Sequence, residues 1–549
     1  MRIKVGNSKK AIAAGGAAIL LLSLAACGSN RDDDSGDGDG AGSSNVKGDP
    51  ITIGTTDSVT ALDPAGSYDQ GSSTLEYNMY QTLLTIPAGE NTPQGDAAES
   101  CQYDDPQTFT CKLKPNLKFS NGNALTSSDV KYSLERAINI ADPNGAAIYL
   151  LGSIGKPNKD GVLQTVPDAI ETPDDQTVIF HLNKPDTTFQ FVLTYPGAGA
   201  IVDEDTFPAD KELPDDEVIG SGPYKLSQYK SGEQAVFEIN DEYTGDNQGQ
   251  APQIFVSYYS TPSALKLAAE DGDVDIAWRS LSPTDLSDLK EGGKVTVAEG
   301  DGAEIRYFVW DVASPVGKDL ATRQAVAQLI DRDKIASTAY ENTVSPLYSI
   351  VPPGFPGQVD AFQEKYGEPN VDAAKKLLDD AGVKTPVSLT LGYTPTHYGP
   401  NAVDEATELQ RQLEDSGLFD VQLKSAEWEQ YQTIYKEGAY DLWILGWYPD
   451  YPDPDDYLSV FLVDGGFFQN GYHNEEVNSL VNHELGSTDP AARSEDFVKL
   501  QNIAARDVPI IPSWVGNNVA VYGDGVDGAT VKATLDTAYI FRLWTITTT

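Results

Sequence analysis

Residues 446–454 read Gly-Trp-Tyr-Pro-Asp-Tyr-Pro-Asp-Pro, and no other stretch of the sequence says as much about the fold and the site. The prolines restrict the backbone, and the aromatic residues supply flat apolar walls around the carboxylate of Asp450. This combination favours a rigid loop in which Asp450 supplies a fixed negative charge. A structural explanation stays open, in which Trp447 packs in the interior and Asp453 caps the segment that follows.

The composition limits the class of protein. The chain has 549 residues, of which 40% are hydrophobic and 22% are charged, so it is long enough for two or three domains with buried cores. It carries 83 acidic against 38 basic residues, a formal net charge of −45. A surface this negative repels phosphate groups, which argues against nucleic acid as a partner and against a basic grip on anionic lipid.

The N-terminus has the pattern of an export signal. Four basic residues lie within the first ten, and residues 11–26 follow without a charge, a run too short for a comfortable membrane span. Ala25-Ala26-Cys27 resembles the lipobox of bacterial lipoproteins, in which the signal is cut before the cysteine and the thiol carries diacylglycerol. We therefore expect a signal peptide over 1–26 and a lipid on Cys27. The alternative is an ordinary signal peptide whose cleavage site happens to contain a cysteine.

Residues 27–50 are rich in Gly, Ser and Asp and contain almost nothing apolar. Such a segment does not bury enough surface to offset the entropy of ordering it, so we expect a flexible acidic tether. The rest of the chain is expected on the extracytoplasmic face of the cell membrane, held there through the lipid alone.

Beyond residue 50 the hydrophobic pattern changes between strand-like and helix-like segments. Strands are predicted at 51–54, 108–113, 177–182, 235–239 and 254–259, and helices at 126–138, 320–330, 371–381 and 404–413. The first of these helices begins with a capping box formed by Thr126 and Asp129. Strands and helices that mix without strict alternation predict an α/β fold with mixed sheets.

No set of catalytic residues stands out, which favours a binding protein over an enzyme. The sequence has four histidines and three cysteines but no Gly-x-Ser-x-Gly motif and no zinc-ligand spacing, so no metal and no cofactor are expected. Gly523–Gly528 matches a dinucleotide-binding fingerprint by letter. Ala529–Ala533 is strand-like where that motif needs a helix, so we predict a turn instead. Cys101 and Cys111 flank a polar turn and are predicted to form a disulfide; the alternative is two free buried thiols.

Six blocks in order along the chain resemble the family 5 solute-binding proteins of ABC importers, which include oligopeptide and dipeptide binders. The blocks are Ala97–Val130, Gly220–Tyr224, Arg323–Arg332, Asp372–Gly382, Gly446–Pro454 and Arg506–Pro512. The resemblance implies an α/β fold of two lobes like that of periplasmic binding proteins. It also implies mixed sheets, two hinge crossings and an inserted subdomain in the first lobe.

The family's order of segments gives expected boundaries. Lobe I is expected over 51–302 with an inserted subdomain at about 75–190, lobe II over 303–512, and a return to lobe I over 513–549. The two hinge crossings are thus expected near residues 303 and 513. A cleft between two lobes encloses most of a ligand, and closing of the hinge signals that the ligand is bound.

The same resemblance implies roles for individual side chains. In peptide-binding members the aspartate at the position of Asp450 pairs with the α-ammonium of the ligand. Tryptophans at the positions of Trp447 and Trp428 line side-chain pockets, and Tyr448 adds an aromatic wall. Tyr68 lies in a loop that faces the cleft in the family.

One loop departs from the family's pattern. Where dipeptide binders carry a basic residue for the carboxylate of the ligand, residues 393–401 read YTPTHYGPN. Only His397 is able to become charged there, and mostly below neutral pH. This departure argues against a dipeptide and leaves a longer peptide that is gripped along its main chain.

The sequence thus predicts a lipid-anchored receptor that binds peptides and delivers them to an ABC permease and its ATPase. The receptor is expected to be a monomer. A second hypothesis keeps the family and replaces the peptide with an oligosaccharide, because 27 tyrosines and seven tryptophans suit sugar stacking. A remote third hypothesis, a secreted hydrolase, lacks a catalytic constellation. Asp450 separates the first two hypotheses, since a neutral sugar needs no lone anion.

Overall fold

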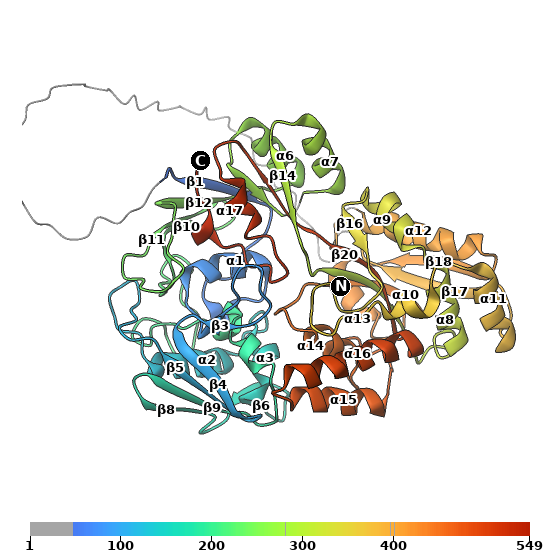
Figure 1. Ribbon diagram of the computed structural model, residues 1–549, viewed down its shortest axis with the longest axis horizontal. Helices are drawn as coiled ribbons and strands as arrows, with labels where there is room; N and C mark the ends of the chain where they lie inside the picture. The colour runs from blue at the N-terminus through green and yellow to red at the C-terminus, as the bar shows by residue number, and fades with distance from the viewer. Residues whose placement is uncertain (1–47, 280, 396, 400) are drawn as a thin grey trace, which may run out of the picture. The chain divides into compact units, whose positions relative to one another are not determined.

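The computed structural model describes residues 48–279, 281–395, 397–399 and 401–549. Two large mixed sheets organise this part of the chain (Figure 1). The seven-stranded sheet has the order β10 (Tyr224–Lys230), β11 (Gln234–Ile239), β12 (Gln253–Tyr258), β1 (Ile51–Thr55), β13 (Ile276–Trp278), β21 (Asn518–Tyr522) and β14 (Thr296–Gly300). We call the part built on this sheet lobe I. Cys27 and the expected signal peptide lie outside the described residues.

The six-stranded sheet forms the second lobe, which we call lobe II. Its order is β16 (Val344–Pro346), β20 (Ile510–Gly516), β15 (Ile305–Trp310), β19 (Leu442–Trp447), β17 (Val387–Tyr393) and β18 (Phe419–Ser425). Every residue of β15 is buried. Its side chains alternate between two apolar cores, one on each face of the sheet. A strand buried on both faces reads as a continuous hydrophobic run rather than an alternating one.

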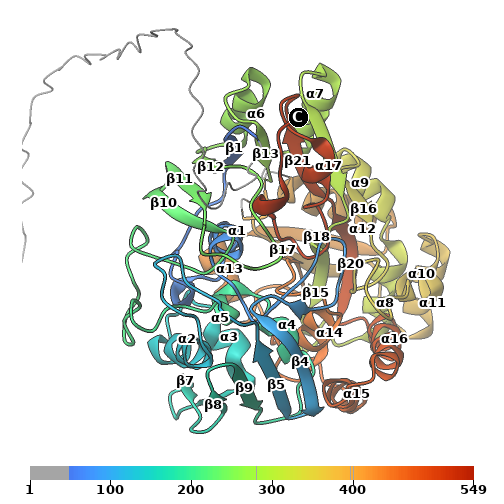
Figure 2. The same cartoon turned by 60° about the vertical axis from the view of Figure 1, so that its left-hand side comes forward.

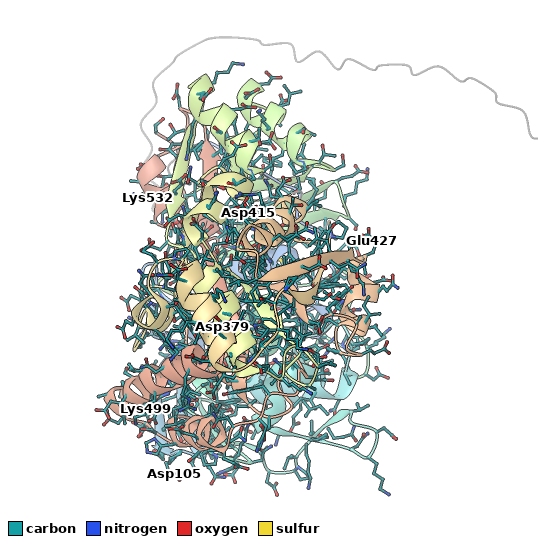
Figure 3. The ribbon with its side chains drawn as sticks, turned by 90° about the vertical axis from the view of Figure 1, so that its right-hand side faces the viewer. Asp105, Asp379, Asp415, Glu427, Lys499 and Lys532 are labelled. Carbon is teal, nitrogen blue, oxygen red and sulfur yellow. A yellow bond between two sulfur atoms is a disulfide. The ribbon has the colours of Figure 1, made fainter. Side chains whose placement is uncertain are left out.

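Helices cover both faces of the sheet of lobe II. One core contains side chains from α8 (Leu320–Leu329), α9 (Arg332–Tyr340), α10 (Ala361–Tyr366), α11 (Val371–Asp380) and α12 (Ala402–Asp415). The other contains side chains from α13 (Trp428–Ile434), α14 (Asp455–Leu462), α15 (Glu475–Leu485) and α16 (Pro490–Asp507). The outer faces of these helices carry exposed charges, such as Asp379 on α11 and Asp415 on α12 (Figure 3).

A third sheet lies beside lobe I and falls within the range expected for the inserted subdomain. Its order is β4 (Ala98–Asp105), β5 (Thr108–Leu113), β9 (Thr177–His181) and β8 (Ile170–Asp174) (Figure 2). A disulfide joins Cys101 to Cys111 across β4 and β5, as the sequence predicts. Helix α2 (Ser127–Ile140) begins with the predicted capping box, in which the side chains of Thr126 and Asp129 bond each other's backbone amides.

The shorter elements connect these layers. The strands are β2 (Leu84–Thr85), β3 (Gln94–Gly95), β6 (Gly155–Pro157) and β7 (Leu163–Thr165). The helices are α1 (Gln70–Met79), α3 (Ala147–Leu150), α4 (Phe189–Val192), α5 (Pro196–Gly199), α6 (Pro262–Asp271), α7 (Pro283–Gly292) and α17 (Gly528–Lys532). Within the part of the chain that the structure describes, no helix combines the length and the apolar character needed to cross a bilayer.

The chain passes between the two large sheets at two crossings that lie side by side. The first runs from Gly300 at the end of β14 to Ile305 at the start of β15, close to the expected residue 303. The second lies between Gly516 and Asn518. The amide of Gly516 donates to the carbonyl oxygen of Glu304 at 2.9 Å, which ties the crossings together.

The expected position of the second crossing, near residue 513, is four residues too early. Residues 513–516 still belong to β20 and pair with β15 and β16. Pro512 suggests the end of a strand because it lacks an amide donor, but a register shift in the pairing with β15 accommodates it. The strand therefore continues beyond the proline.

The prediction for residues 529–533 is wrong, because α17 replaces the expected strand-like run. The carboxylate of Asp527 accepts a hydrogen bond from the amide of Ala529 at 3.0 Å and caps the helix, while Val531 is buried. Capping and burial outweigh the weak strand preference of β-branched residues. A carboxylate already occupies this short helix's N-terminus, so the fingerprint match does not form a phosphate site.

Candidate functional site: a cavity between the two lobes

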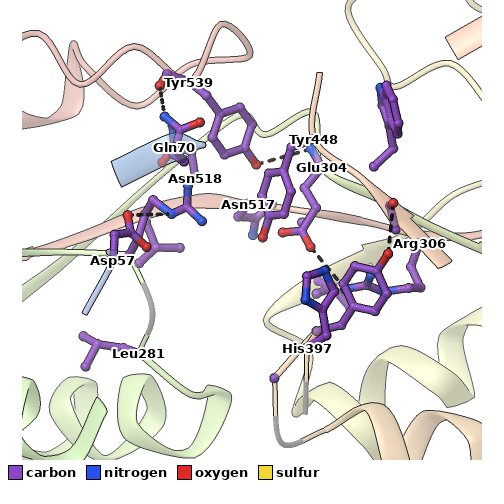
Figure 4. A pocket seen from close by; sticks show the side chains of 18 of the residues that line it. Asp57, Gln70, Leu281, Glu304, Arg306, His397, Tyr448, Asn517, Asn518 and Tyr539 are labelled. Carbon is purple, nitrogen blue, oxygen red and sulfur yellow. Dashed lines mark hydrogen bonds and ion pairs between the residues drawn. The ribbon is translucent and has the colours of Figure 1, made fainter. Parts of the chain in front are cut away.

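A cavity of about 1000 Å³ is lined by residues from both lobes and from both crossings (Figure 4). All six residues that the sequence proposes for ligand binding line it: Tyr68, His397, Trp428, Trp447, Tyr448 and Asp450. They come from positions as far apart as the loop before α1 and the segment after β19. The fold therefore brings the predicted residues together, and their part in binding stays a prediction.

Asp450 lies at the wall of this cavity just beyond the end of β19. Its Oδ2 accepts a hydrogen bond of 2.6 Å from the hydroxyl of Tyr68. Burial raises the pKa of Asp450 to about 6, and the hydrogen bond from Tyr68 offsets part of that rise. Among the described residues, no Lys, Arg or His forms an ion pair with this carboxylate. A buried carboxylate without a cation is costly, and a cationic group on a ligand removes that cost.

A second carboxylate, Asp456 in the first turn of α14, holds both Asp450 and Trp447 in place. Its Oδ2 accepts the amide of Asp450 at 2.8 Å and the indole nitrogen of Trp447 at 3.2 Å. Burial raises the pKa of Asp456 well above its ordinary value, and repulsion from the charge of Asp450 adds to the effect. One oxygen atom thus orients two of the residues that the sequence assigns to the ligand.

Asp453 belongs to the structural framework rather than to the cavity wall. It forms two hydrogen bonds of 2.8 Å with the guanidinium of Arg493 on α16. Its Oδ1 also accepts the amide of Asp455 at 3.0 Å, close to the capping role that the sequence suggests. Glu484 bonds the same guanidinium, so a buried ionic cluster anchors the segment that follows Asp450.

His397 and Trp428 form a stacked pair at the wall of the cavity. Their rings are parallel to within 2° with centroids 3.8 Å apart. Desolvation and the nearby positive charge of Arg306 together lower the pKa of His397 to about 4. His397 is therefore neutral at physiological pH, so it supplies a flat ring to the cavity rather than a charge for the carboxylate of a ligand.

Sequence reasoning missed Arg306, which lies in β15 beneath the loop that carries His397. Its guanidinium carbon lies 3.9 Å from the ring centroid of Tyr398 and 4.7 Å from that of Trp514. Nη2 donates to Glu304 at 3.2 Å, whereas Nε and Nη1 are buried without a hydrogen-bond partner. The sequence does contain a sign of this residue, because a single arginine interrupts the otherwise apolar run of β15.

Sequence reasoning also missed Arg279, which follows β13 in lobe I. Its guanidinium carbon lies 5.2 Å from the ring centroid of Tyr448, which belongs to lobe II, and 5.7 Å from that of Trp278. Its Nε lies 3.6 Å from Oδ2 of Asp57, and its Nη1 has no hydrogen-bond partner among the described residues. The positive φ of 61° at Arg279 directs this side chain, and no sequence pattern signals such a backbone conformation.

The fold and the cavity together define a two-lobe binding protein of the periplasmic type, with a charged and aromatic cavity between its lobes. The residues 92–469 match the bacterial extracellular solute-binding proteins, family 5 Middle. The chain belongs to this family, whose members are solute-binding proteins. Among the described residues, no group of three or more His, Cys, Asp or Glu is placed to hold a metal ion.

Individual relatives match over most of their length. The dipeptide-binding protein DppE of Bacillus subtilis is 25% identical over 498 residues, covering 85% of this chain and 87% of the relative. The periplasmic oligopeptide-binding protein OppA of Salmonella typhimurium is 25% identical over 505 residues, covering 89% and 91%. The ABC transporter substrate-binding protein CtaP of Listeria monocytogenes has a similar structure, with a TM-score of 0.76 at 23% identity over 91% of this chain and 99% of that one.

Proposed function

We propose that the protein captures peptides in the cavity between its lobes and delivers them to an ABC permease in the membrane. The observation that carries the proposal is Asp450, a half-buried carboxylate at the cavity wall without a basic partner among the described residues. The α-ammonium of a peptide is a cation of the right size to pair with it. The names of the relatives DppE and OppA, which bind dipeptides and oligopeptides, support the same class of ligand.

The aromatic walls fit the remainder of a peptide. Trp447, Tyr448 and the stacked pair of Trp428 and His397 offer flat apolar surfaces to side chains. Because the cavity holds about 1000 Å³, it has room for several residues of an extended chain. Closing of the two lobes around the bound peptide then presents a distinct surface to the permease and its ATPase.

A double-mutant cycle tests the role of Asp450. Replacing Asp450 with Asn keeps the shape and removes the charge, and acetylating the peptide removes the charge on the other side. Removing one partner of a buried charge pair costs about 2–5 kcal/mol, so each single change is expected to weaken binding by roughly 30-fold or more. The second change should add much less in the presence of the first.

The matched control is Asp379→Asn on the outer face of α11, where the charge pairs with the exposed Lys375 at 2.6 Å. Calorimetry of this variant should reproduce the wild-type affinity. If the effects of Asp450→Asn and acetylation simply add, or if neither changes affinity, then Asp450 does not bind the ammonium group.

An oligosaccharide is the second candidate, because aromatic rings line the cavity and suit sugar faces. A neutral sugar leaves the carboxylate of Asp450 without a cation, which is why we rank it below a peptide. Mass spectrometry of ligands that co-purify with the protein separates the candidates. Bound sugars and an absence of peptides would replace the peptide proposal.

We further propose that the mature protein is a monomer, held at the outer face of the cell membrane by a lipid on Cys27. The support for the lipid anchor is the sequence Ala25-Ala26-Cys27 after an uncharged run. Cys27→Ser should release the protein into the medium or leave an uncleaved precursor. A variant that remains membrane-bound and normally processed would contradict the anchor.

A further inference from the structure

The charges around the cavity are unequal, and the surplus is negative. Among the described residues that line it, the acidic side chains are Asp57, Asp69, Glu304 and Asp450, and the fully charged basic side chains are Arg279 and Arg306. Asp69 caps α1 by accepting the amide of Ser72 at 2.8 Å, so it already has a structural role.

Each guanidinium charge is matched by a carboxylate of the protein itself. Nη2 of Arg306 bonds Glu304 at 3.2 Å, and a second carboxylate, Glu405, lies 3.9 Å from Nε. Nε of Arg279 lies 3.6 Å from Asp57. Aromatic rings flank both guanidinium groups, which keeps water away from these pairs. Neither arginine therefore needs an anion from the ligand to balance its charge.

Among the described residues, both guanidinium groups nevertheless keep N–H donors without a hydrogen-bond partner. These are Nε and Nη1 of Arg306 and Nη1 of Arg279. A buried donor without an acceptor costs free energy, so an oxygen atom of the ligand is favourable there. A neutral carbonyl oxygen of the ligand accepts this hydrogen bond without adding a charge. A carboxylate would add a negative charge beside Glu304 or Asp57, which raises its cost.

Asp450 is the acid that remains without a matching cation among the described residues. Asp456 lies directly behind it and bonds its amide at 2.8 Å, so it holds the loop in place and supplies no positive charge. Closing the cavity around a ligand removes water from this region and strengthens the field of the Asp450 carboxylate. The cavity therefore favours a ligand that brings more positive than negative charge.

We propose that the cavity selects peptides of net positive charge, with the ammonium group at Asp450 and neutral main-chain carbonyl oxygens at Arg306 and Arg279. The C-terminal carboxylate of such a peptide finds no unmatched cation among the described residues that line the cavity. This inference rests on the proposed function, since it assumes a peptide ligand. The net charge of −45 acts in the same direction by concentrating cations near the protein.

Retention of matched peptide pools tests this selectivity. Random pools of three to five residues are synthesised as free acids and as C-terminal amides, mixed in equal amounts, and passed over the immobilised protein. Mass spectrometry of the retained fraction should show amides bound at least as well as their free acids, with an enrichment of about tenfold for short peptides that the cavity encloses completely. Lys- and Arg-containing sequences should be enriched over Asp- and Glu-containing ones.

The variant Glu304→Gln examines the physical cause. It keeps the main-chain bond between residue 304 and Gly516 but leaves the charge of Arg306 without its nearest partner. The preference should then shift towards free acids by about tenfold, whereas the control Glu495→Gln on the exposed face of α16 should leave it unchanged.

The outcomes separate the two proposals. Retention of free acids in preference to amides by the wild type, or an unchanged preference in Glu304→Gln, overturns the inference and leaves peptide binding standing. Retention of no peptide from any pool overturns the proposed function and the inference with it.

Discussion

The hydroxyl of Tyr68 donates to Oδ2 of Asp450 across 2.6 Å, although the two residues are 382 positions apart in the chain. Tyr68 belongs to the loop before α1 in lobe I, and Asp450 follows β19 in lobe II. The bond therefore joins the two lobes at the residue that we assign to the ammonium group of the ligand. It also supplies a donor to a carboxylate that burial would otherwise drive towards its protonated form.

Affinity for a ligand with a free amine should fall as the pH drops through about 6. Burial raises the pKa of Asp450 to about 6, so below that pH the carboxylate is protonated and no longer attracts an ammonium group. The dissociation constant should rise by up to about tenfold per pH unit between pH 6 and 5. Calorimetry from pH 7.5 to 5 measures this dependence. A profile that is equally steep in Asp450→Asn would show that another group titrates.

Replacing Tyr68 with Phe should move this pH dependence to higher pH. The hydrogen bond from Tyr68 lowers the pKa of Asp450, so its loss raises that pKa, by about one unit for a bond to a charged group. The matched control is Tyr149→Phe, because the ring of Tyr149 stacks on that of Tyr68 at 5.3 Å and its side chain is exposed. A midpoint that stays in place in Tyr68→Phe would contradict the assignment.

A methyl group at Gly302 should disturb the two crossings. A Cβ there would collide with the carbonyl oxygen of Gly516, so Gly302→Ala forces the chains apart. We expect the free energy of unfolding to fall by about 1–3 kcal/mol. Gly292→Ala at the end of α7 is the control, because nothing lies within 4 Å of its Cβ position and the change should be neutral or stabilising. Urea unfolding of both variants measures the difference, and equal stabilities would count against close packing at the crossings.

Loss of the disulfide between Cys101 and Cys111 should destabilise the folded state. The bond closes a loop with a sequence separation of 10, so replacing both cysteines with Ser should lower the free energy of unfolding by about 2–3 kcal/mol. Reduction of the wild type should produce the same loss. Alkylation of the unfolded but unreduced mature protein should label neither cysteine, and quantitative labelling of both would disprove the bond.

Local signals in the sequence predicted local structure well. The capping box of Thr126 and Asp129 depends on residues three positions apart, and it begins α2 as expected. The predicted strand at 108–113 matches β5 in both bounds. The segment 529–533 shows the limit of such reasoning, because a cap on Asp527 and burial of Val531 outweigh residue preference there. Whether a side chain is buried depends on segments that a local pattern does not contain.

The sequence by itself determined the family and the α/β class, because six short blocks follow one another in the family's order, and the resemblance led to the six residues that line the cavity. Only the tertiary structure decided how these residues act on one another. Arg306 lies beneath His397 and lowers its pKa, and Tyr68 reaches Asp450 from the other lobe. Such effects arise from burial and from charges a few ångströms apart in space, and residues hundreds of positions apart in the chain become neighbours only when both lobes have folded.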